Sequence, residues 1–371
     1  MKPDQFVLER YFARYEFSAP YLLCSSDCDA LSLQELLTLA DSESLALWKN
    51  LSLGYTESQG HPLLLSEISN LYDNIPTSKL LEVIPEEGIF IAMNTLLQPG
   101  DHLVVTHPGY QSLYEIARAL NCEVSYWQPQ PLPGRWYFDV AELADLIRPN
   151  TRMLVVNFPH NPTGALPTKD EFQAIVDLAA RSNLHLFSDE MYRQLEYHPD
   201  ERLPAACDLY DKAISLSGLS KSYALAGLRV GWLAVSSPSL IAPLIELKDY
   251  TTICGSAPSE ILAIAALRAG EAILARSLDI VTANLARLDE FFEQNAATFH
   301  WRRPLAGSVG FAELLNGQPI MQFCQQLVEA QGVMLLPSDV YGYESNCFRI
   351  GFGRKNMPEA LARLQLFLTS A

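Results

Sequence analysis

The sequence is short of positive charge and has no long hydrophobic run. Its 371 residues include 26 lysines and arginines against 43 aspartates and glutamates, which gives a formal net charge of −17. A chain this acidic is a poor candidate for binding nucleic acid or an anionic membrane. No apolar stretch approaches the ~18 residues of a membrane span, and residues 1–16 lack the apolar core of a secretion signal. We expect a cytoplasmic protein that binds neither nucleic acid nor membrane.

Cysteine is sparse as well. The seven cysteines are scattered, and only Cys24 and Cys28 lie close together. The paired spacing of a zinc site is missing, so we predict reduced thiols and no metal site. The remaining composition, 49% hydrophobic and 19% charged, is typical of a globular protein. The length allows one large domain and a smaller one.

The middle of the chain alternates short apolar runs with helical patterns. Runs that end at turn residues indicate strands buried on both faces; they cover residues 102–106, 152–157, 184–188, 213–217 and 230–235. Between two of them, Thr168 and Glu171 form a capping box ahead of a helical repeat. This alternation predicts a largely parallel sheet, in which ligands bind at the carboxyl ends of the strands.

The final third of the chain has a different pattern, with a long amphipathic helix at 271–293 and a strand at 348–352. We predict three parts from these patterns and the usual size of domains. Residues 1–45 form an N-terminal arm that packs with the small domain, residues 46–245 the large cofactor-binding domain, and residues 246–371 a small C-terminal domain.

The most informative stretch holds Lys221, at the end of a Ser-Gly-Leu-Ser-Lys run, and Arg229 shortly after it. A lysine can form a Schiff base with an aldehyde. A serine hydroxyl and a guanidinium can hold a phosphate, the guanidinium through paired hydrogen bonds. Together they suit a covalent cofactor that carries a phosphate.

This stretch resembles the cofactor-lysine segment of the class I/II aminotransferase family. The members of that family are fold type I enzymes that use pyridoxal 5'-phosphate. Further motifs extend the resemblance over most of residues 50–370. It implies an α/β fold: a mostly parallel, seven-stranded-type central sheet with helices on both faces in a large domain, plus a smaller α+β domain.

Two expected strand ends carry candidate cofactor ligands. Asn161 lies in Asn-Pro-Thr-Gly, and its family equivalent hydrogen-bonds the cofactor's phenolic oxygen, as does the equivalent of Tyr192. Asp189 precedes Tyr192 closely. A carboxylate is needed there because the pyridine nitrogen must stay protonated for the ring to absorb electrons. Glu190 competes for this role, but Asp189 occupies the family position.

Two tyrosines complete the resemblance around the ring and phosphate. Tyr110, in Pro-Gly-Tyr, corresponds to the aromatic residue that stacks on the cofactor. Tyr55 resembles the tyrosine that reaches the phosphate of the neighbouring subunit. The resemblance therefore implies a homodimer with shared active sites.

The chain departs from the family where the phosphate should meet backbone amides at a helix start. Residues 84–88 read Ile-Pro-Glu-Glu-Gly, and proline offers no amide hydrogen. Glu86 and Glu87 can still donate their backbone hydrogens, with their carboxylates directed away from the phosphate. A second departure is Gly218, where many relatives have serine, so the hydroxyl contact falls to Ser217 or Ser220.

Arg349 lies inside an apolar strand near the C-terminus. A buried arginine is costly unless it meets an anion, which could be a structural carboxylate. In relatives the matching arginine binds the substrate's α-carboxylate, and we expect Arg349 and Asn161 to bind substrate. No second arginine stands out for a distal carboxylate, which disfavours a dicarboxylate substrate.

The resemblance implies an aminotransferase that moves an amino group from an α-amino acid to a 2-oxo acid through a Schiff base at Lys221. Fold and cofactor leave other pyridoxal chemistry open: lyase, decarboxylase, racemase or cyclase. The polar arm at 24–29 keeps that alternative open, because it could border the substrate pocket. A non-enzymatic regulator is disfavoured by the acidic charge and by the lack of an added DNA-binding segment.

Overall fold

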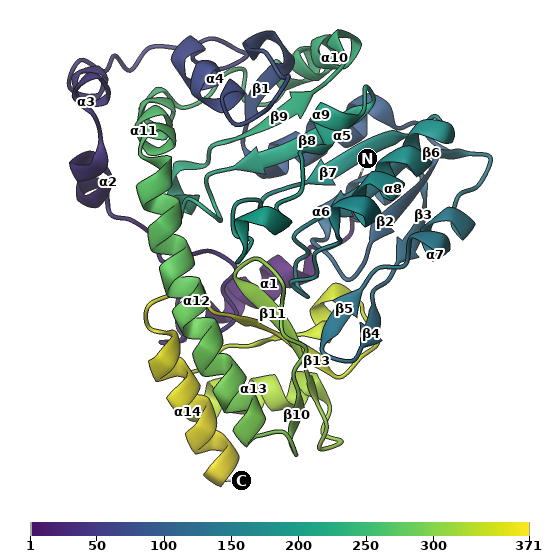
Figure 1. Ribbon diagram of the computed structural model, residues 1–371, viewed down its shortest axis with the longest axis vertical. Helices are drawn as coiled ribbons and strands as arrows, with labels where there is room; N and C mark the ends of the chain where they lie inside the picture. Colours follow the sequence, from purple (N-terminus) through teal and green to yellow (C-terminus); the bar gives the residue numbers. More distant parts are fainter. Residues whose placement is uncertain (1, 371) are drawn as a thin grey trace.

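A seven-stranded sheet forms the centre of the computed structural model, which describes residues 2–370 (Figure 1). Its strand order is β1-β9-β8-β7-β6-β2-β3. The bounds are β1 Leu80–Val83, β2 His102–Thr106, β3 Glu123–Trp127, β6 Thr151–Asn157, β7 His185–Asp189, β8 Ala213–Gly218 and β9 Gly231–Val235. All neighbours pair in parallel except β9, which is antiparallel to both β8 and β1. The predicted mostly parallel α/β fold is therefore confirmed.

The strands of this sheet are buried on both faces because alternate side chains enter different cores. In β6, Met153 and Val155 join the core that contains helix α5 (Pro85–Leu96), whereas Leu154 and Val156 join the core that contains helix α8 (Lys169–Arg181). Each fully buried aliphatic side chain contributes roughly 2 kcal/mol. Burial on both faces explains why these strands read as continuous apolar runs in the sequence.

Helices flank the sheet, and most are short. The first group comprises α1 Val7–Tyr15, α2 Leu33–Leu39, α3 Ser42–Lys49, α4 Pro62–Ser69, α5 Pro85–Leu96, α6 Ser112–Ala119 and α7 Val140–Asp145. The second comprises α8 Lys169–Arg181, α9 Ala206–Leu209, α10 Pro238–Lys248 and α11 Ala257–Arg268. Thr168 caps α8, with both hydrogen bonds of the predicted capping box present. No helix within residues 2–370 is long and apolar enough to cross a membrane.

A four-stranded antiparallel sheet, ordered β10-β11-β13-β12, forms the second layer of structure. Its strands are β10 Phe299–His300, β11 Val309–Leu314, β12 Leu336–Pro337 and β13 Cys347–Gly351. The helices α12 Gly270–Gln294, α13 Ile320–Gln331 and α14 Met357–Ser370 accompany it. The long helix α12 runs from α11, beside the large sheet, down to α14 (Figure 1). A hairpin of β4 Gln130–Leu132 and β5 Arg135–Tyr137 forms a separate two-stranded sheet. Trp136 of β5 donates a hydrogen bond to the carbonyl of Phe311 in β11 at 3.3 Å, so the hairpin packs against the four-stranded sheet.

The N-terminal segment joins both sheets. Tyr21 bridges to Val333, and the amide of Gly351 donates to the carbonyl of Leu23, so this segment lies along the four-stranded sheet. At the other side, Gln111 of the large sheet's layer accepts a hydrogen bond from the amide of Val7 at 2.9 Å. Helix α1 is thereby held over the space between the sheets.

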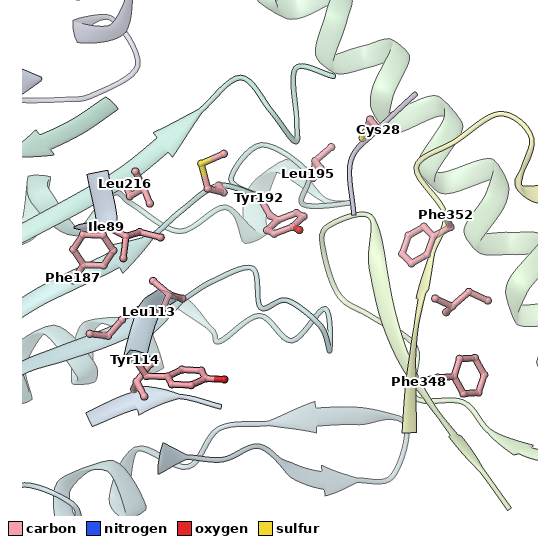
Figure 2. Close-up of a cluster of buried hydrophobic side chains, with 14 of the residues drawn as sticks. Cys28, Ile89, Leu113, Tyr114, Phe187, Tyr192, Leu195, Leu216, Phe348 and Phe352 are labelled. Carbon is pink, nitrogen blue, oxygen red and sulfur yellow. The ribbon is translucent and has the colours of Figure 1, made fainter. Parts of the chain in front are cut away.

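One buried cluster connects the two halves (Figure 2). It includes Phe187 and Leu216 from the large sheet and Phe348 from the four-stranded one, each no more than 1% exposed. Tyr192 belongs to the same cluster. The candidate site residues that follow β7 and β8 therefore stand on a tightly packed base.

Candidate functional site

The carboxyl ends of β2, β6, β7 and β8 open onto one cavity of about 400 Å³. The strand order reverses here, because β3 lies on one side of β2 and β6 on the other, and ligands of α/β sheets bind at such switch points. Nine predicted residues line the cavity: Glu86, Tyr110, Asn161, Asp189, Tyr192, Ser220, Lys221, Arg229 and Arg349. Tyr55 and Glu87 do not. Sequence motifs separated by up to 263 residues thus meet in one place.

Lys221 follows β8 and presents its amine to the cavity. Its Nζ donates a hydrogen bond to the Ser26 hydroxyl at 2.9 Å and lies 5.9 Å from the centre of the Tyr192 ring. Burial lowers the pKa of this amine, against the opposing effect of Asp27. A lysine with a lowered pKa is a better nucleophile near neutral pH because more of it is uncharged.

Asp189, at the last position of β7, is a buried carboxylate that no positively charged side chain of residues 2–370 contacts directly. Its Oδ1 accepts the amide hydrogen of Met191 at 3.1 Å. Burial raises the pKa of this carboxyl to about 6. Glu190 is excluded from the same role, because its Oε1 accepts from Ser215 and Ala206 behind the sheet.

Arg349 and Asn161 meet at the opposite wall of the cavity. Arg349 comes from β13 and is 2% exposed, yet no carboxylate lies within ion-pair distance of it in the described part of the chain. Its guanidinium donates to Asn161 Oδ1 at 3.1 Å and to the carbonyl of Cys24 at 3.0 Å. A structural carboxylate, one of the two ways to satisfy this arginine, is therefore excluded within residues 2–370. A buried cation without a counter-ion favours an anionic ligand.

Tyr192 places a polar atom in the cavity wall without a protein partner. The residue is 3% exposed, and its hydroxyl makes no hydrogen bond to any residue between 2 and 370. An unpaired buried hydroxyl costs about 1–3 kcal/mol. Such a group is explained if a ligand supplies the missing partner.

The predicted phosphate side holds Ser220, Arg229 and the start of α5. Ser220 lines the cavity and is 7% exposed, whereas Ser217 does not line it. Arg229 has a left-handed backbone, with φ of 58°, which is uncommon for a residue with a side chain and is frequent at functional sites.

The side chains of the two glutamates at the start of α5 point in different directions. The Glu87 carboxylate points away from the cavity and accepts hydrogen bonds from the Thr252 hydroxyl and from the amide of Ile84.

Glu86, in contrast, lines the cavity, contrary to the expectation that its carboxylate points away. Its Oε2 accepts a hydrogen bond from the Ser112 hydroxyl at 3.1 Å. Burial, together with the smaller effect of the nearby Glu9, raises the pKa of this carboxyl to about 7 against the opposing effect of the hydrogen bond from Ser112. The hydroxyl of Tyr110, the predicted stacking residue, donates to Glu9 Oε1 at 3.1 Å.

Several cavity residues come from the N-terminal segment and were not predicted individually. Leu8, Glu9 and Phe12 line the cavity from α1, Glu16 from the position directly after that helix, and Ser25, Ser26 and Asp27 from the following loop. The polar run at 24–29 was the only sequence signal for them. Helix α1 offered none, because its position over the cavity depends on distant contacts such as Gln111 with Val7.

These residues fit pyridoxal phosphate by the chemistry of their unpaired groups. The cavity contains an amine of lowered pKa, a buried carboxylate without a cation, an unpaired hydroxyl and a buried guanidinium without an anion. These are Lys221, Asp189, Tyr192 and Arg349. An aldehyde, a ring nitrogen, a phenolic oxygen and a substrate carboxylate would complement them in turn.

Comparison with known proteins agrees with this chemistry. The family model described as aminotransferase class I and II matches residues 21–364. Capreomycidine synthase of Streptomyces vinaceus is 31% identical over 281 residues, covering 75% of this chain and 71% of that protein.

Two solved structures are similar over the whole chain. A pyridoxal-phosphate-dependent aminotransferase from Streptococcus suis has a TM-score of 0.93 at 30% identity, covering 100% of this chain and 99% of the other. The pyridoxal-phosphate-dependent cyclase OrfR has a TM-score of 0.90 at 26% identity, covering 100% and 98%.

Proposed function

Because the chain belongs to the class I and II aminotransferase family, we propose that it transfers the amino group of an α-amino acid to a 2-oxo acid, with Lys221 as the cofactor lysine. The protein is a pyridoxal-phosphate-dependent enzyme. The observation that carries the proposal is the position of Lys221 in one cavity with Asp189 and Arg349, two buried ions that have no ionic partner among residues 2–370.

Four residues would hold the cofactor. When bound, pyridoxal phosphate supplies an aldehyde that condenses with amines and a ring that delocalises the charge left by a departing α-proton. Asp189 would hold the protonated ring nitrogen, and Asn161 and Tyr192 the phenolic oxygen. Arg229 would hold the phosphate.

The remaining steps belong to the chain's own side chains. Arg349 binds and orients the substrate's α-carboxylate, with a geometry suited to paired hydrogen bonds. The Nζ of Lys221 takes the α-proton as a general base, and its lowered pKa favours the uncharged amine that this requires. Leu8 and Phe12 of α1 cover the cavity with apolar surface and exclude water.

The active unit in this proposal is a homodimer. Four large apolar side chains are strongly exposed on two loops joined by the hydrogen bond from Ser58 to Asp249: Leu53 at 83%, Tyr55 at 93%, Tyr250 at 88% and Ile253 at 52%. Exposed apolar clusters mark interaction surfaces. A second copy that covers these loops would bring its Tyr55 toward the neighbouring cavity.

A second candidate function is cyclisation of an amino acid on the same scaffold. This candidate is supported by the similar solved structure of OrfR, which is described as a pyridoxal-phosphate-dependent cyclase. The same cavity can serve both reactions, since both begin with loss of the α-proton.

A nitrogen-transfer experiment separates the two functions. The purified holoenzyme is given amino acids labelled with ¹⁵N at the α-amine, with and without pyruvate or 2-oxoglutarate. Transamination predicts ¹⁵N-alanine or ¹⁵N-glutamate in amounts that depend on the 2-oxo acid. A product that retains the label in a ring, or ammonia or carbon dioxide released without an acceptor, would contradict it.

A further inference from the structure

Three carboxylates in the cavity have no role in the proposed function. Glu9, Glu16 and Glu86 line the same cavity as Lys221 and Arg349. Within residues 2–370, none of the three forms an ion pair. The cavity's other surplus acid, Asp27, differs because Arg354 lies 3.0 Å from its Oδ2.

The charges of the cavity do not balance once the cofactor and an α-carboxylate are assigned. Asp189, Lys221, Arg229 and Arg349 take part in those contacts, and the Asp27–Arg354 pair is neutral. Glu9, Glu16 and Glu86 then remain as negative charges. An acidic wall of this kind repels a second carboxylate and attracts a cation.

Glu9 and Glu86 lie close together around one tyrosine. The Tyr110 hydroxyl donates to Glu9 Oε1 at 3.1 Å, and both carboxylates raise the pKa of Tyr110, after the larger effect of burial. Arg229, assigned above to the phosphate, lines the same cavity and lowers the pKa of Tyr110. The groups that act most strongly on the Glu86 carboxyl are Ser112, Glu9, Asp189 and Tyr110. None of these is a cation, so a pair of carboxylates is held together at a free-energy cost.

Helix α1 links this pair to the position of Arg349. Glu9, Phe12 and Glu16 lie on one face of α1, at spacings of three and four residues. The Phe12 ring lies 5.8 Å from the Arg349 guanidinium. Glu9 is therefore about one helical turn, roughly 5 Å along α1, from the residue that covers Arg349. A long amino-acid side chain spans a distance of that order.

Ligand binding in this cavity is indicated independently of the acids. Tyr192 is 3% exposed with an unpartnered hydroxyl, and Arg349 is 2% exposed without a carboxylate, as far as residues 2–370 are concerned. Both groups line the cavity.

We propose that the amino-acid substrate carries a cation at the end of its side chain, an ammonium or a guanidinium, and that Glu9 and Glu86 bind it while Arg349 binds the α-carboxylate. This inference rests on the proposed function for its α-amino-acid substrate. It adds two specificity residues, and it explains why an unbalanced carboxylate pair is kept beside the cofactor. Glu16 completes the acidic wall on the same face of α1.

Matched ligands test this proposal directly. Arginine and citrulline have nearly the same shape but differ in side-chain charge, as do lysine and norleucine. Binding to the holoenzyme is measured by calorimetry at pH 8 without a 2-oxo acid. We expect arginine or lysine to bind at least about 10-fold more tightly than its neutral counterpart, as for hydrogen bonds to charged groups. Equal affinity within both pairs would overturn the proposal.

Charge-removing variants locate the effect. Glu9→Gln and Glu86→Gln keep hydrogen-bond acceptors for Tyr110 and Ser112, and each should reduce the charged-to-neutral affinity ratio about 10-fold. Glu115→Gln, which removes a buried carboxylate of α6 outside the cavity, should leave the ratio unchanged.

The pH dependence of the same ratio gives a further test. Because burial raises the pKa of Glu86 to about 7, the wild-type charged-to-neutral affinity ratio should fall as the pH is lowered from 8 to 6. The fall should be smaller in Glu86→Gln. A ratio unaffected by both cavity variants would contradict the assignment.

The two proposals can fail separately. If ¹⁵N is transferred from neutral amino acids and the affinity ratio is near one, the aminotransferase proposal stands and the cationic substrate is wrong. If arginine or lysine binds selectively but no nitrogen is transferred to any 2-oxo acid, the cationic pocket stands and transamination is wrong.

Discussion

Arg349 Nη1 donates a hydrogen bond to Asn161 Oδ1 at 3.1 Å, although 188 residues separate the two in the sequence. Arg349 belongs to the four-stranded sheet, and Asn161 follows a strand of the seven-stranded sheet. The contact therefore joins the candidate substrate anchor to a candidate cofactor ligand. A substrate carboxylate held by Arg349 lies next to the group that would hold the phenolic oxygen.

The first prediction concerns this anchor. Arg349→Lys keeps the charge but loses the planar fork that binds a carboxylate through two hydrogen bonds. We expect KM for the amino acid to rise about 30- to 100-fold, from a loss of roughly 2–3 kcal/mol. Binding of the corresponding amine without an α-carboxylate should change little. Steady-state kinetics with both ligands check this, and an equal loss for the amine would argue against a carboxylate contact.

Asp189→Asn should separate stability from activity. Burial raises the pKa of this carboxyl to about 6 in the folded protein, above its ordinary value of 3.8. Its stabilising contribution is therefore present below pH 3.8 and is lost as pH rises through 6. Removing the charge should stabilise the apoprotein at pH 8 by on the order of 2 kcal/mol, and by progressively less toward pH 4.

The same variant should lose most of its turnover, about 10²-fold or more, because the ring nitrogen loses its carboxylate partner. Denaturant unfolding of the apoprotein at several pH values and turnover of the holoenzyme provide the two measurements. An apoprotein destabilised at pH 8, or a variant with normal turnover, would show that Asp189 has a structural role.

Tyr192→Phe tests the unpaired hydroxyl. The wild-type hydroxyl is buried without a protein partner in the described residues, so its removal should leave the apoprotein equally stable or more stable by about 1 kcal/mol. With cofactor bound, the variant should show a shifted absorption maximum, since a hydrogen bond to the phenolic oxygen is lost. An unchanged spectrum together with a destabilised apoprotein would place the hydroxyl in the fold instead.

Tyr55 tests the shared active site. At 93% exposure, Tyr55→Phe should not alter the stability of an isolated chain. If the tyrosine of one subunit reaches the phosphate of the other, the variant should release cofactor about 10-fold more readily, the loss of one charge-assisted hydrogen bond. Equilibrium dialysis measures this, and light scattering measures the subunit number. A monomer that retains cofactor normally would refute the arrangement.

The fold was predictable where local chemistry decides it. The strand around Val155 is buried on both faces and is therefore continuously apolar, and Thr168 caps its helix with local hydrogen bonds. Lys221 and Asp189 could be identified for a similar reason, since Asp189 ends one strand of the large sheet and Lys221 lies shortly after the end of the next strand.

The contribution of the N-terminal segment could not be predicted in the same way. Ser26 contacts Lys221 across 195 residues, and Glu9 contacts Tyr110 across 101. No periodicity or motif within α1 encodes those pairings, because they arise from how the segment crosses between two sheets. The direction of the Glu86 side chain likewise depends on Ser112, a residue of another helix.

The most direct test of the central claim is to map the lysine that carries the cofactor. The purified holoenzyme is reduced with sodium borohydride, digested with trypsin and analysed by mass spectrometry. A pyridoxyl-phosphate group should appear on Lys221, within the uncleaved peptide Ala213–Arg229, and Lys221→Ala should carry none. A group found on another lysine of the native holoenzyme, or undiminished labelling of the variant, would contradict the assignment of this cavity as the active site.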